Sequence, residues 1–412
     1  MNMAKEYKDL VVGLDIGTSK IMAVVAEVQP DATLKVLGMG VAPSNGMKRG
    51  VVVNIEGCVQ SIQQAVREAE MMAACKITHV TTGITGSHIR GRNSVGMVAV
   101  RDREVSPTDV AKVLETARAI NISTDQRLLQ IEPQEFVIDG QEVKEPIGMS
   151  GIRLESKVHI VTCAHSAAEN ILKCVRRCGL EVGQLMVNPL AASLSVLTED
   201  ERELGVVLVD IGAGTTDIAV FAGGTIRHTA VLPVAGELIT SDIAMALRTP
   251  TEDAEDIKLQ NGCAKQLMAD PETHIEVAGL SGRPPRLLSK QVLAGVIEPR
   301  VEEIFSLVQK EVQGSGFEHL VSSGVVLTGG SAVMPGMVEL GEDIFLKPVR
   351  VGTPGYRGAL ADMVSQPRAA VVMGMLEDMR MSQLREHTNI RKKDASMKGV
   401  FGRIKDLIVR NF

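Results

Sequence analysis

The sequence predicts an α/β protein made of two halves with related architecture. An apolar strand, a turn of Asp-Ile-Gly with small polar residues, and two further strands run from Leu10 to Val41. The same order of elements returns in the middle of the chain, from Gly205 to Val234. A meander that occurs twice indicates a repeated structural unit. Apolar residues at helical spacing between these strands, as in residues 56–75, supply the α component.

An inserted unit is expected between the two copies. Ser106 and Pro107 are typical of an N-cap and a first helical position, and the helix that they start is predicted to run to Ile120. Strand-like stretches flank it, so residues 84–163 are predicted to form a compact β-α-β-β subdomain. The strands are expected at 96–101, 128–137 and 157–163, and later helices at 237–247, 251–259 and 290–313.

Composition narrows the class of protein. The chain has 412 residues, 45% of them hydrophobic, which favours two or three folded domains over disorder. Aromatic residues are only 2% and the net charge is −6, which argues against a nucleic-acid binder that stacks bases on aromatic side chains. Six cysteines without a C-x-x-C pair argue against a disulfide framework or a zinc module and favour a reducing cytoplasm. The N-terminal segment has no signal-peptide pattern.

The two Asp-Ile-Gly turns are the principal candidate site. Backbone amides in such a turn can form an anion nest, and glycine lets phosphate oxygens approach closely. Asp15 and Asp210 at the strand ends suit water-mediated Mg²⁺ binding. One such turn could equally be an ordinary hairpin, but two in matching meanders favour a triphosphate held between two domains. The predicted phosphate-binding residues are Asp15, Gly17, Thr18, Ser19, Lys20, Asp210, Gly212, Gly214, Thr215 and Thr216.

Two further positions are candidates for the nucleoside. Gly329 and Gly330 follow an apolar strand and could bring backbone close to adenine or ribose, although the pair is also typical of a plain strand-ending turn. Glu255 and Lys258 share one helical face and could reach ribose hydroxyls, or they could form a surface ion pair.

The C-terminal segment predicts membrane contact. Residues 399–412 place apolar side chains on one helical face and basic side chains on the other, the pattern of a helix that lies in a membrane interface. Residues 382–398 before it are polar and basic and are predicted to be a flexible linker. A terminal helix packed on the protein's own core is the alternative. The predicted lipid-facing residues are Val400, Phe401, Ile404, Leu407, Ile408 and Phe412.

These motifs carry a resemblance. The paired turns are similar to the phosphate-1 and phosphate-2 signatures of the actin, Hsp70 and sugar-kinase superfamily, and Leu327–Ser331 resembles its adenosine motif. Within that superfamily the whole chain resembles the FtsA family of bacterial cell-division proteins. The segments that carry this closer likeness are 13–20, 140–151, 188–193, 282–286, 325–337 and the basic amphipathic tail.

The resemblance implies an actin-like, duplicated ribonuclease H-like fold of two domains and four subdomains, with an inserted subdomain and a C-terminal amphipathic helix. ATP with Mg²⁺ would lie between the domains on the residues named above, with Gly329, Gly330 and Ser331 at the adenosine and Glu255 and Lys258 at the ribose. The implied divisions are a first core of 1–83, 164–193 and 353–381, the insert 84–163, a second core of 194–236 and 314–352, an outer subdomain 237–313, the linker 382–398 and the membrane helix 399–412.

The resemblance also implies a function. Such a protein polymerises and tethers FtsZ filaments to the cytoplasmic face of the inner membrane at the division septum, as a peripheral membrane protein. FtsZ would bind the outer subdomain and other divisome proteins the insert. ATP would be an assembly ligand with at most weak hydrolysis. A sugar-kinase-type phosphotransferase is the alternative, against which the few aromatics and the basic tail argue. An Hsp70-type chaperone would need a substrate-binding domain after the core, and a shape-determining actin relative fits the insert poorly.

Overall fold

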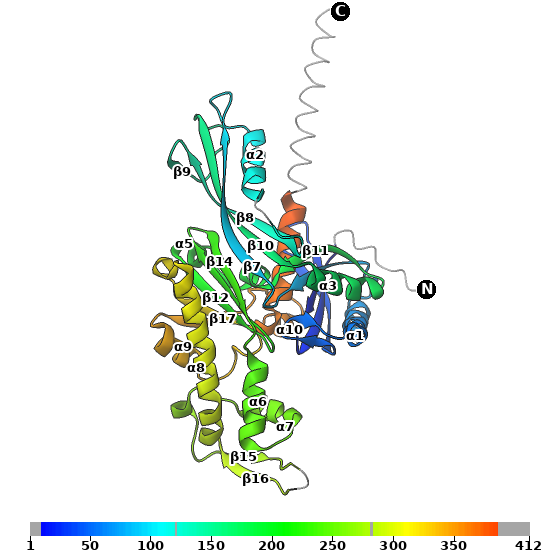
Figure 1. Ribbon diagram of the computed structural model, residues 1–412. Helices are drawn as coiled ribbons and strands as arrows, with labels where there is room; N and C mark the ends of the chain where they lie inside the picture. Colours follow the sequence, from blue (N-terminus) through cyan, green and yellow to red (C-terminus); the bar gives the residue numbers. More distant parts are fainter. Residues whose placement is uncertain (1–9, 120–121, 281–282, 386–412) are drawn as a thin grey trace, which may run out of the picture.

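The computed structural model describes residues 10–119, 122–280 and 283–385. Figure 1 shows two α/β domains with a third sheet projecting from between them. The predicted membrane helix at 399–412 and linker residues 386–398 lie outside the described part of the chain. Residues 370–385 are helical, so the first part of the predicted linker, 382–385, belongs to a helix instead. Arg385 and Ser382 are exposed there, so polar side chains of this helix face solvent.

The first domain is built on a five-stranded sheet with the order β11-β6-β1-β2-β3. The first three strands in sequence form an antiparallel meander, and β6 and β11 extend the sheet in parallel. The strands are β1 (Leu10–Ile16), β2 (Lys20–Val28), β3 (Leu34–Pro43), β6 (His79–Ile84) and β11 (Glu181–Val187).

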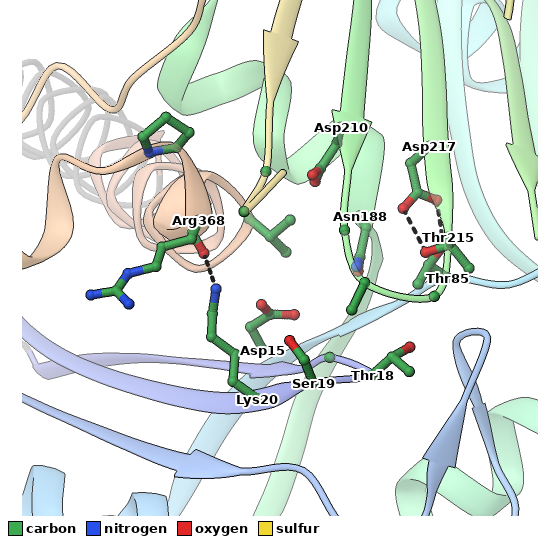
Figure 2. A pocket seen from close by; sticks show the side chains of 18 residues that line it. Asp15, Thr18, Ser19, Lys20, Thr85, Asn188, Asp210, Thr215, Asp217 and Arg368 are labelled. Atoms are coloured by element: carbon green, nitrogen blue, oxygen red, sulfur yellow. Dashed lines mark hydrogen bonds between the residues drawn. The ribbon is translucent and has the colours of Figure 1, made fainter. Parts of the chain in front are cut away.

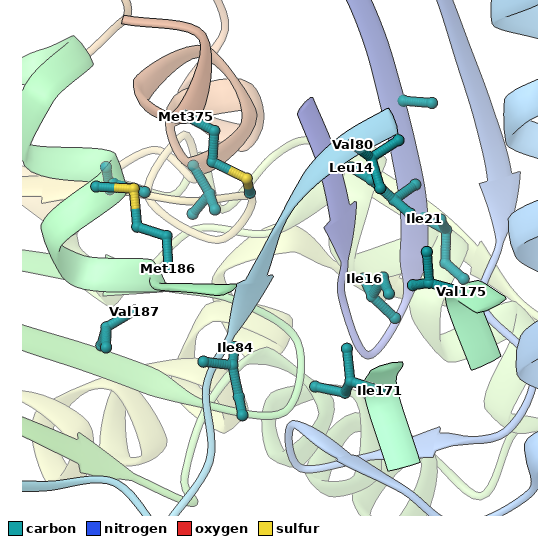
Figure 3. Packing of buried hydrophobic residues seen from close by; sticks show 14 of the residues in the cluster. Leu14, Ile16, Ile21, Val80, Ile84, Ile171, Val175, Met186, Val187 and Met375 are labelled. Atoms are coloured by element: carbon teal, nitrogen blue, oxygen red, sulfur yellow. The ribbon is translucent and has the colours of Figure 1, made fainter. Parts of the chain in front are cut away.

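Helices cover both faces of this sheet, which explains the almost continuous apolar run of β1. Leu14 and Ile16 share a core with α1 (Ile55–Ala73) and α3 (His165–Arg177). Val11, on the alternate face, packs with the helical residues 370–376. Figure 3 shows Leu14, Ile16 and Ile21 of the sheet close to Ile171 and Val175 of α3. That packing fixes the end of β1 where the first Asp-Ile-Gly turn begins.

The second domain repeats the topology of the first. Its sheet has the order β14-β13-β12-β17-β18, again an antiparallel meander followed by two parallel strands. The predicted duplication is therefore present in the strand order and not only in the sequence. The strands are β12 (Val206–Ile211), β13 (Thr216–Ala222), β14 (Thr225–Leu232), β17 (Val325–Thr328) and β18 (Val349–Val351).

The helices of the second domain lie on one face of its sheet and extend beyond it. Figure 1 shows α6, α7 and the long α8 leading away from the sheet toward a small hairpin. The side chains of α6 and α8 form a second core with Val207, Val209 and Ile211 of β12. The elements are α6 (Gly236–Leu247), α7 (Thr251–Asn261), β15 (His274–Val277), β16 (Arg286–Ser289), α8 (Lys290–Ser315) and α9 (Met337–Phe345).

The insert lies between β6 and α3 and is a separate antiparallel sheet with the order β7-β10-β8-β9. The helix α2 (Pro107–Arg118) packs on it, and the Ser106 side chain accepts from the Asp109 amide in a capping box, as the start signal predicted. The strands are longer than the sequence indicated, because their exposed ends lack a clear apolar pattern. They are β7 (Arg90–Ala99), β8 (Gln126–Ile138), β9 (Gln141–Val143) and β10 (Arg153–Ala164).

Two crossings connect the domains. The outgoing one contains α4 (Asn188–Val196) and α5 (Glu199–Leu204), and the returning one follows β18 and contains α10 (Ala361–Val364). Ser195 donates its hydroxyl hydrogen bond to the carbonyl of Ala370 at 2.7 Å, which ties the two crossings together. The Arg350 guanidinium pairs with Glu201 at 2.6 and 2.7 Å. These contacts hold the two crossings next to each other.

Candidate functional site

A narrow cleft lies where the two Asp-Ile-Gly turns meet. Figure 2 shows Asp15, Thr18, Ser19 and Lys20 on one side and Asp210, Thr215 and Asp217 on the other. The lining residues come from both domains: Asp15, Gly17, Thr18, Ser19, Lys20, Thr85, Asn188, Asp210, Gly212, Ala213, Gly214, Thr215, Asp217, Gly329, Gly330, Pro367, Arg368 and Val371.

The two turns have the same internal geometry. The Gly17 amide donates to the Lys20 carbonyl at 3.0 Å, and the Gly212 amide donates to the Thr215 carbonyl at 3.0 Å. Each bond closes a tight turn between antiparallel strands and leaves the amides of the residues inside it without an acceptor among the described residues. Free amides that line a cleft can bind an anion. The amides concerned are those of Thr18, Ser19, Ala213 and Gly214.

The turns also contact each other across the domain boundary. A Cβ atom built at Gly214 would lie 2.6 Å from Oγ1 of Thr18, so only glycine allows this approach. Helix α6 begins directly behind the second turn, because the Gly236 amide donates to the Gly212 carbonyl at 3.1 Å. Its N-terminus therefore adds positive potential on that side of the cleft.

Two buried carboxylates lie at the strand ends behind the turns. Asp15 is 8% exposed and Asp210 is 7% exposed. Burial raises the pKa of Asp15 to about 6, against the opposing effect of Lys20. Burial and the neighbouring Asp15 raise the pKa of Asp210 to about 7. Two buried acids that disfavour each other's charge form a site that a cation would stabilise.

One cationic side chain is held at the bottom of the cleft. The Lys20 Nζ donates to the carbonyl of Arg368 at 2.9 Å (Figure 2). Burial lowers the pKa of Lys20, and Arg368 lowers it further, while Asp15 and Asp210 raise it. The ammonium group thus bridges the first domain and the returning crossing, and it can interact with an anion bound at the turns.

Four polar residues of the cleft, Thr85, Asn188, Asp217 and Arg368, were not among the predicted site residues. Asp217 is 3% exposed and accepts hydrogen bonds from the hydroxyls of Thr85 and Thr215, the latter at 3.3 Å. Burial and Asp210 raise the pKa of Asp217 well above its usual value. Asn188 is buried, and its Oδ1 has no partner among the described residues. Since the Thr85–Asp217 bond joins the two domains, it forms a further bridge across the cleft.

Comparison with known proteins shows to which family the chain is related. A family model described as "Cell division protein FtsA" matches residues 207–374, and one described as "SHS2 domain inserted in FTSA" matches residues 86–162. The cell division protein FtsA of Pseudomonas aeruginosa is 56% identical over 89% of this chain and 88% of its own length. This chain belongs to the FtsA family. The FtsA of Escherichia coli K12 is 44% identical over 94% of each chain.

Solved structures confirm the actin-like fold class that was predicted for this FtsA-family chain. The type IV pilus biogenesis complex PilM-PilN matches with a TM-score of 0.63 and 18% identity, over 90% of this chain and 98% of the other. MreB5 of Spiroplasma citri, solved bound to ADP, matches with a TM-score of 0.54 and 15% identity, over 93% of this chain and 100% of the other. In the described residues, no helix combines the length and apolar character that a membrane span requires.

Most of the predicted FtsA site residues line the cleft, and four do not. Thr216 follows Thr215 in a strand, so its side chain points away and its hydroxyl donates to the carbonyl of Val234 at 2.7 Å. Ser331 donates its hydroxyl hydrogen bond to the carbonyl of Gly212 at 3.1 Å and thereby supports the second turn from behind. Glu255 and Lys258 form an ion pair at 2.6 Å beside the start of α6.

The ion pair of α7 is more than a surface contact. The Lys258 Nζ also bonds the hydroxyl of Thr240 at 2.8 Å and the carbonyl of Gly236 at 3.3 Å. Lys258 is 9% exposed, and Glu255 lies at the more open side of the pair. The pair therefore fixes α7 against the first turn of α6, next to the second Asp-Ile-Gly turn but outside the lining of the cleft.

Proposed function

We propose that this chain is an ATP-binding, actin-like cell-division protein that polymerises and tethers FtsZ filaments to the cytoplasmic membrane at the septum. The observation that supports this most directly is the pair of opposed turns, one in each domain, whose free amides meet across one cleft. Membership of the FtsA family supports the role in division. ATP is proposed as an assembly ligand, with at most weak hydrolysis.

The residues of the cleft fit a nucleotide with its metal ion. The phosphates would bind the free amides of Thr18, Ser19, Ala213 and Gly214 together with Lys20. Asp15 and Asp210 would hold Mg²⁺ through water, and the ion would neutralise phosphate charge between two buried carboxylates. In the proposed pose the adenosine lies toward Gly329, Gly330 and Ser331. Glu255 and Lys258 would shape the ribose side, with Lys258 acting through its bonds to α6.

The glycine pair is suited to this role by its backbone. Gly329 has a φ of +88°, and a Cβ there would lie 2.3 Å from Oδ1 of Asp210. Gly330 has no neighbour within 4 Å of its Cβ position, so it presents open backbone to the cleft. A ligand can therefore approach the chain closely at this point.

Closure of the cleft would favour polymerisation, because both domains contribute to one bound nucleotide. Each proposed partner is assigned to one part of the chain. The outer subdomain 237–313 would bind FtsZ, the insert 84–163 other divisome proteins, and the helix 399–412 the membrane.

Sedimentation tests the link between nucleotide and assembly. We expect ATP with Mg²⁺ to increase the pelleted fraction of the protein and its co-sedimentation with FtsZ. Gly214→Ala should abolish the increase, because the new methyl group separates the two turns. Gly183→Ala is the matched control, since its Cβ would meet only the carbonyl of Val80, at 3.9 Å. Equal pelleting with and without ATP would contradict the assembly role.

Liposome flotation tests the membrane role separately. Vesicles that contain anionic lipid should float the full chain, whereas Phe401→Glu or deletion of 399–412 should leave it in the dense fraction. Burial of Phe401 in the interface is lost when a carboxylate replaces the ring. Flotation of the deletion variant at the level of the full chain would show that another surface binds lipid.

A further inference from the structure

A short hairpin of the first domain lies against the phosphate end of the cleft. It consists of β4 (Met47–Lys48) and β5 (Val51–Val52), with Arg49 and Gly50 between them. The Gly50 amide donates to Oγ1 of Thr18 at 3.1 Å, so the hairpin is bonded to the phosphate-1 turn. None of its residues was among the predicted site residues.

The same hairpin also contacts the second domain. A Cβ built at Gly214 would lie 2.9 Å from the Cα of Arg49, so the phosphate-2 turn packs directly on the hairpin backbone. A Cβ at Gly50 would lie 3.0 Å from the carbonyl of Thr85, the residue that bonds Asp217. The hairpin backbone therefore lies against both Thr18 and Gly214, where the two turns meet.

The backbone of the hairpin turn is left-handed at both of its central residues. Arg49 has a φ of +49° and Gly50 a φ of +77°, and a side chain at such a φ is uncommon. Gly50 is buried, while the side chains of Lys48 and Arg49 are exposed. The turn is thus anchored through its glycine and presents two long cationic side chains.

The charges around the cleft leave a role for these cations. The lining contains three carboxylates, Asp15, Asp210 and Asp217, but only two cationic side chains, Lys20 and Arg368. The side chains of Lys48 and Arg49 make no hydrogen bond or ion pair with any described residue. A nucleoside triphosphate adds a terminal phosphate whose charge the lining alone does not match.

The two cations also act on a carboxyl group of the second domain. Glu237, in the first turn of α6, has a pKa raised by burial, and Lys258, Arg49 and Lys48 each oppose that rise. The Glu237 amide donates to the carbonyl of Ala213, inside the phosphate-2 turn. Lys48 and Arg49 therefore act across the boundary between the domains, next to the free amides.

We propose that Lys48 and Arg49 bind the terminal phosphate of a nucleoside triphosphate, so that the β4–β5 hairpin distinguishes the triphosphate from the diphosphate. The inference rests on the proposed nucleotide site and explains how that site would prefer a triphosphate over a diphosphate. Gly329 and Gly330 lie where the nucleoside is proposed to bind. The hairpin lies beside the two turns, where the phosphates are proposed to bind. A guanidinium can hold phosphate oxygens in a bidentate manner, and a cation within hydrogen-bond reach adds to the amide nest.

The test is the ratio of two affinities. Calorimetry measures binding of Mg·ATP and Mg·ADP to the full chain, to Arg49→Gln, and to the double variant Lys48→Gln/Arg49→Gln. Loss of charge-assisted hydrogen bonds should weaken ATP binding by roughly 10- to 100-fold in the double variant, while ADP binding stays within about twofold. Arg67→Gln changes an exposed arginine of α1 whose side chain has no partner among the described residues; it is the matched control and should change neither affinity.

The outcomes separate this inference from the proposed function. If the unmodified chain binds neither nucleotide, the proposed nucleotide site itself fails and this inference fails with it. If the unmodified chain binds both and the variants lose ATP and ADP equally, or lose neither, the site stands and the hairpin does not read the terminal phosphate. Arg49→Lys keeps the charge and should recover part of the ATP affinity, which a purely structural role of Arg49 would not predict. Thermal melts of each variant show whether it is folded.

Discussion

The two domains meet at two places that differ in chemistry. In the cleft, the amides of both turns lack acceptors among the described residues, and Asp15 disfavours the charge of the buried Asp210. At the second place, the insert contacts β14 of the second domain, and its polar groups are paired. The ring nitrogens of His159 bond Oδ1 of Asn93 at 2.7 Å and Oγ1 of Thr229 at 2.9 Å.

Further bonds extend the contact of the insert along β14. The Gln134 side chain donates to the carbonyl of Ile226 at 2.7 Å, and the Asn93 side chain donates to the carbonyl of Arg227 at 3.1 Å. Glu135 accepts from both Arg227 and Lys157. Because β14 is the edge strand of its sheet, the insert also covers backbone groups that an open edge would expose.

The difference shows which contact depends on a ligand. Buried polar groups without partners cost free energy, so the cleft gains most when an anion and a cation occupy it. The insert contact is already satisfied and can hold the domains together without a ligand. We therefore expect damage at the cleft to affect nucleotide binding as well as folding, and damage at the insert contact to affect stability alone.

The largest effect is expected from Gly329→Ala. A side chain at φ +88° is strained, and its Cβ would lie within 2.5 Å of Oδ1 of Asp210 and the carbonyl of Ile211. The free energy of unfolding should fall by roughly 3–5 kcal/mol, with loss of ATP binding. Urea unfolding and calorimetry measure both. Gly330→Ala is the control for the unfolding free energy alone, because its Cβ meets nothing within 4 Å; an equal loss of stability there would show that bulk alone is harmful.

Acid should weaken the insert contact through His159. Burial lowers the pKa of His159 to about 4, with a smaller contribution from His228, whereas the unfolded value is 6.5. The folded chain favours the neutral ring, so this contribution is complete above pH 6.5 and is lost as the pH falls toward 4. The loss reaches roughly 3 kcal/mol at the acid end. Urea unfolding at pH 7 and 4.5 should show a smaller acid loss in His159→Gln, and an unchanged loss would contradict the assignment.

A moderate effect is expected from Arg227→Met. The side chains of Arg227 and Glu135 are 15% and 18% exposed, so removal of the guanidinium leaves a largely buried carboxylate. Lys157 remains 2.8 Å from Glu135 and limits the loss in unfolding free energy to roughly 1–2 kcal/mol. A double-mutant cycle with Glu135→Gln isolates the pair. Coupling close to zero would mean that Lys157 alone satisfies Glu135.

The sequence predicted the turns because their pattern is local and repeated. Asp15 and Asp210 end matching strands, and the strand order of the two sheets follows the same repeat. Neighbouring side chains in an extended chain point to opposite faces. This alternation could have removed Thr216 from the predicted site residues while retaining Thr215. The same alternation pairs Thr215 with Asp217, which was in the motif and was overlooked.

Other parts of the site had no local signal. Thr85, Asn188 and Arg368 come from three distant segments that only the tertiary fold brings to the cleft. His159 lies in a strand of the insert, and nothing in the pattern of that strand indicates that it faces Thr229 of another domain. The hairpin with Arg49 was also missed, because strands of only two residues leave no pattern in the sequence. Long-range contacts of this kind depend on how the domains pack and not on residue spacing.

The smallest effect is expected from Lys144→Gln, which tests the outer end of the insert contact. The Lys144 Nζ lies 3.0 Å from Oε1 of Glu203 in α5, but the two side chains are 84% and 53% exposed. Water and salt screen such a pair, so its loss should change the unfolding free energy by less than about 0.5 kcal/mol. Urea unfolding at low and high salt measures this, with Arg227→Met as the buried counterpart. A loss of unfolding free energy as large as that of Arg227→Met would mean that exposed pairs at the edge of the insert contact stabilise it as much as His159 and Arg227 do. The contrast between a satisfied, buried insert contact and an unsatisfied cleft would then be wrong.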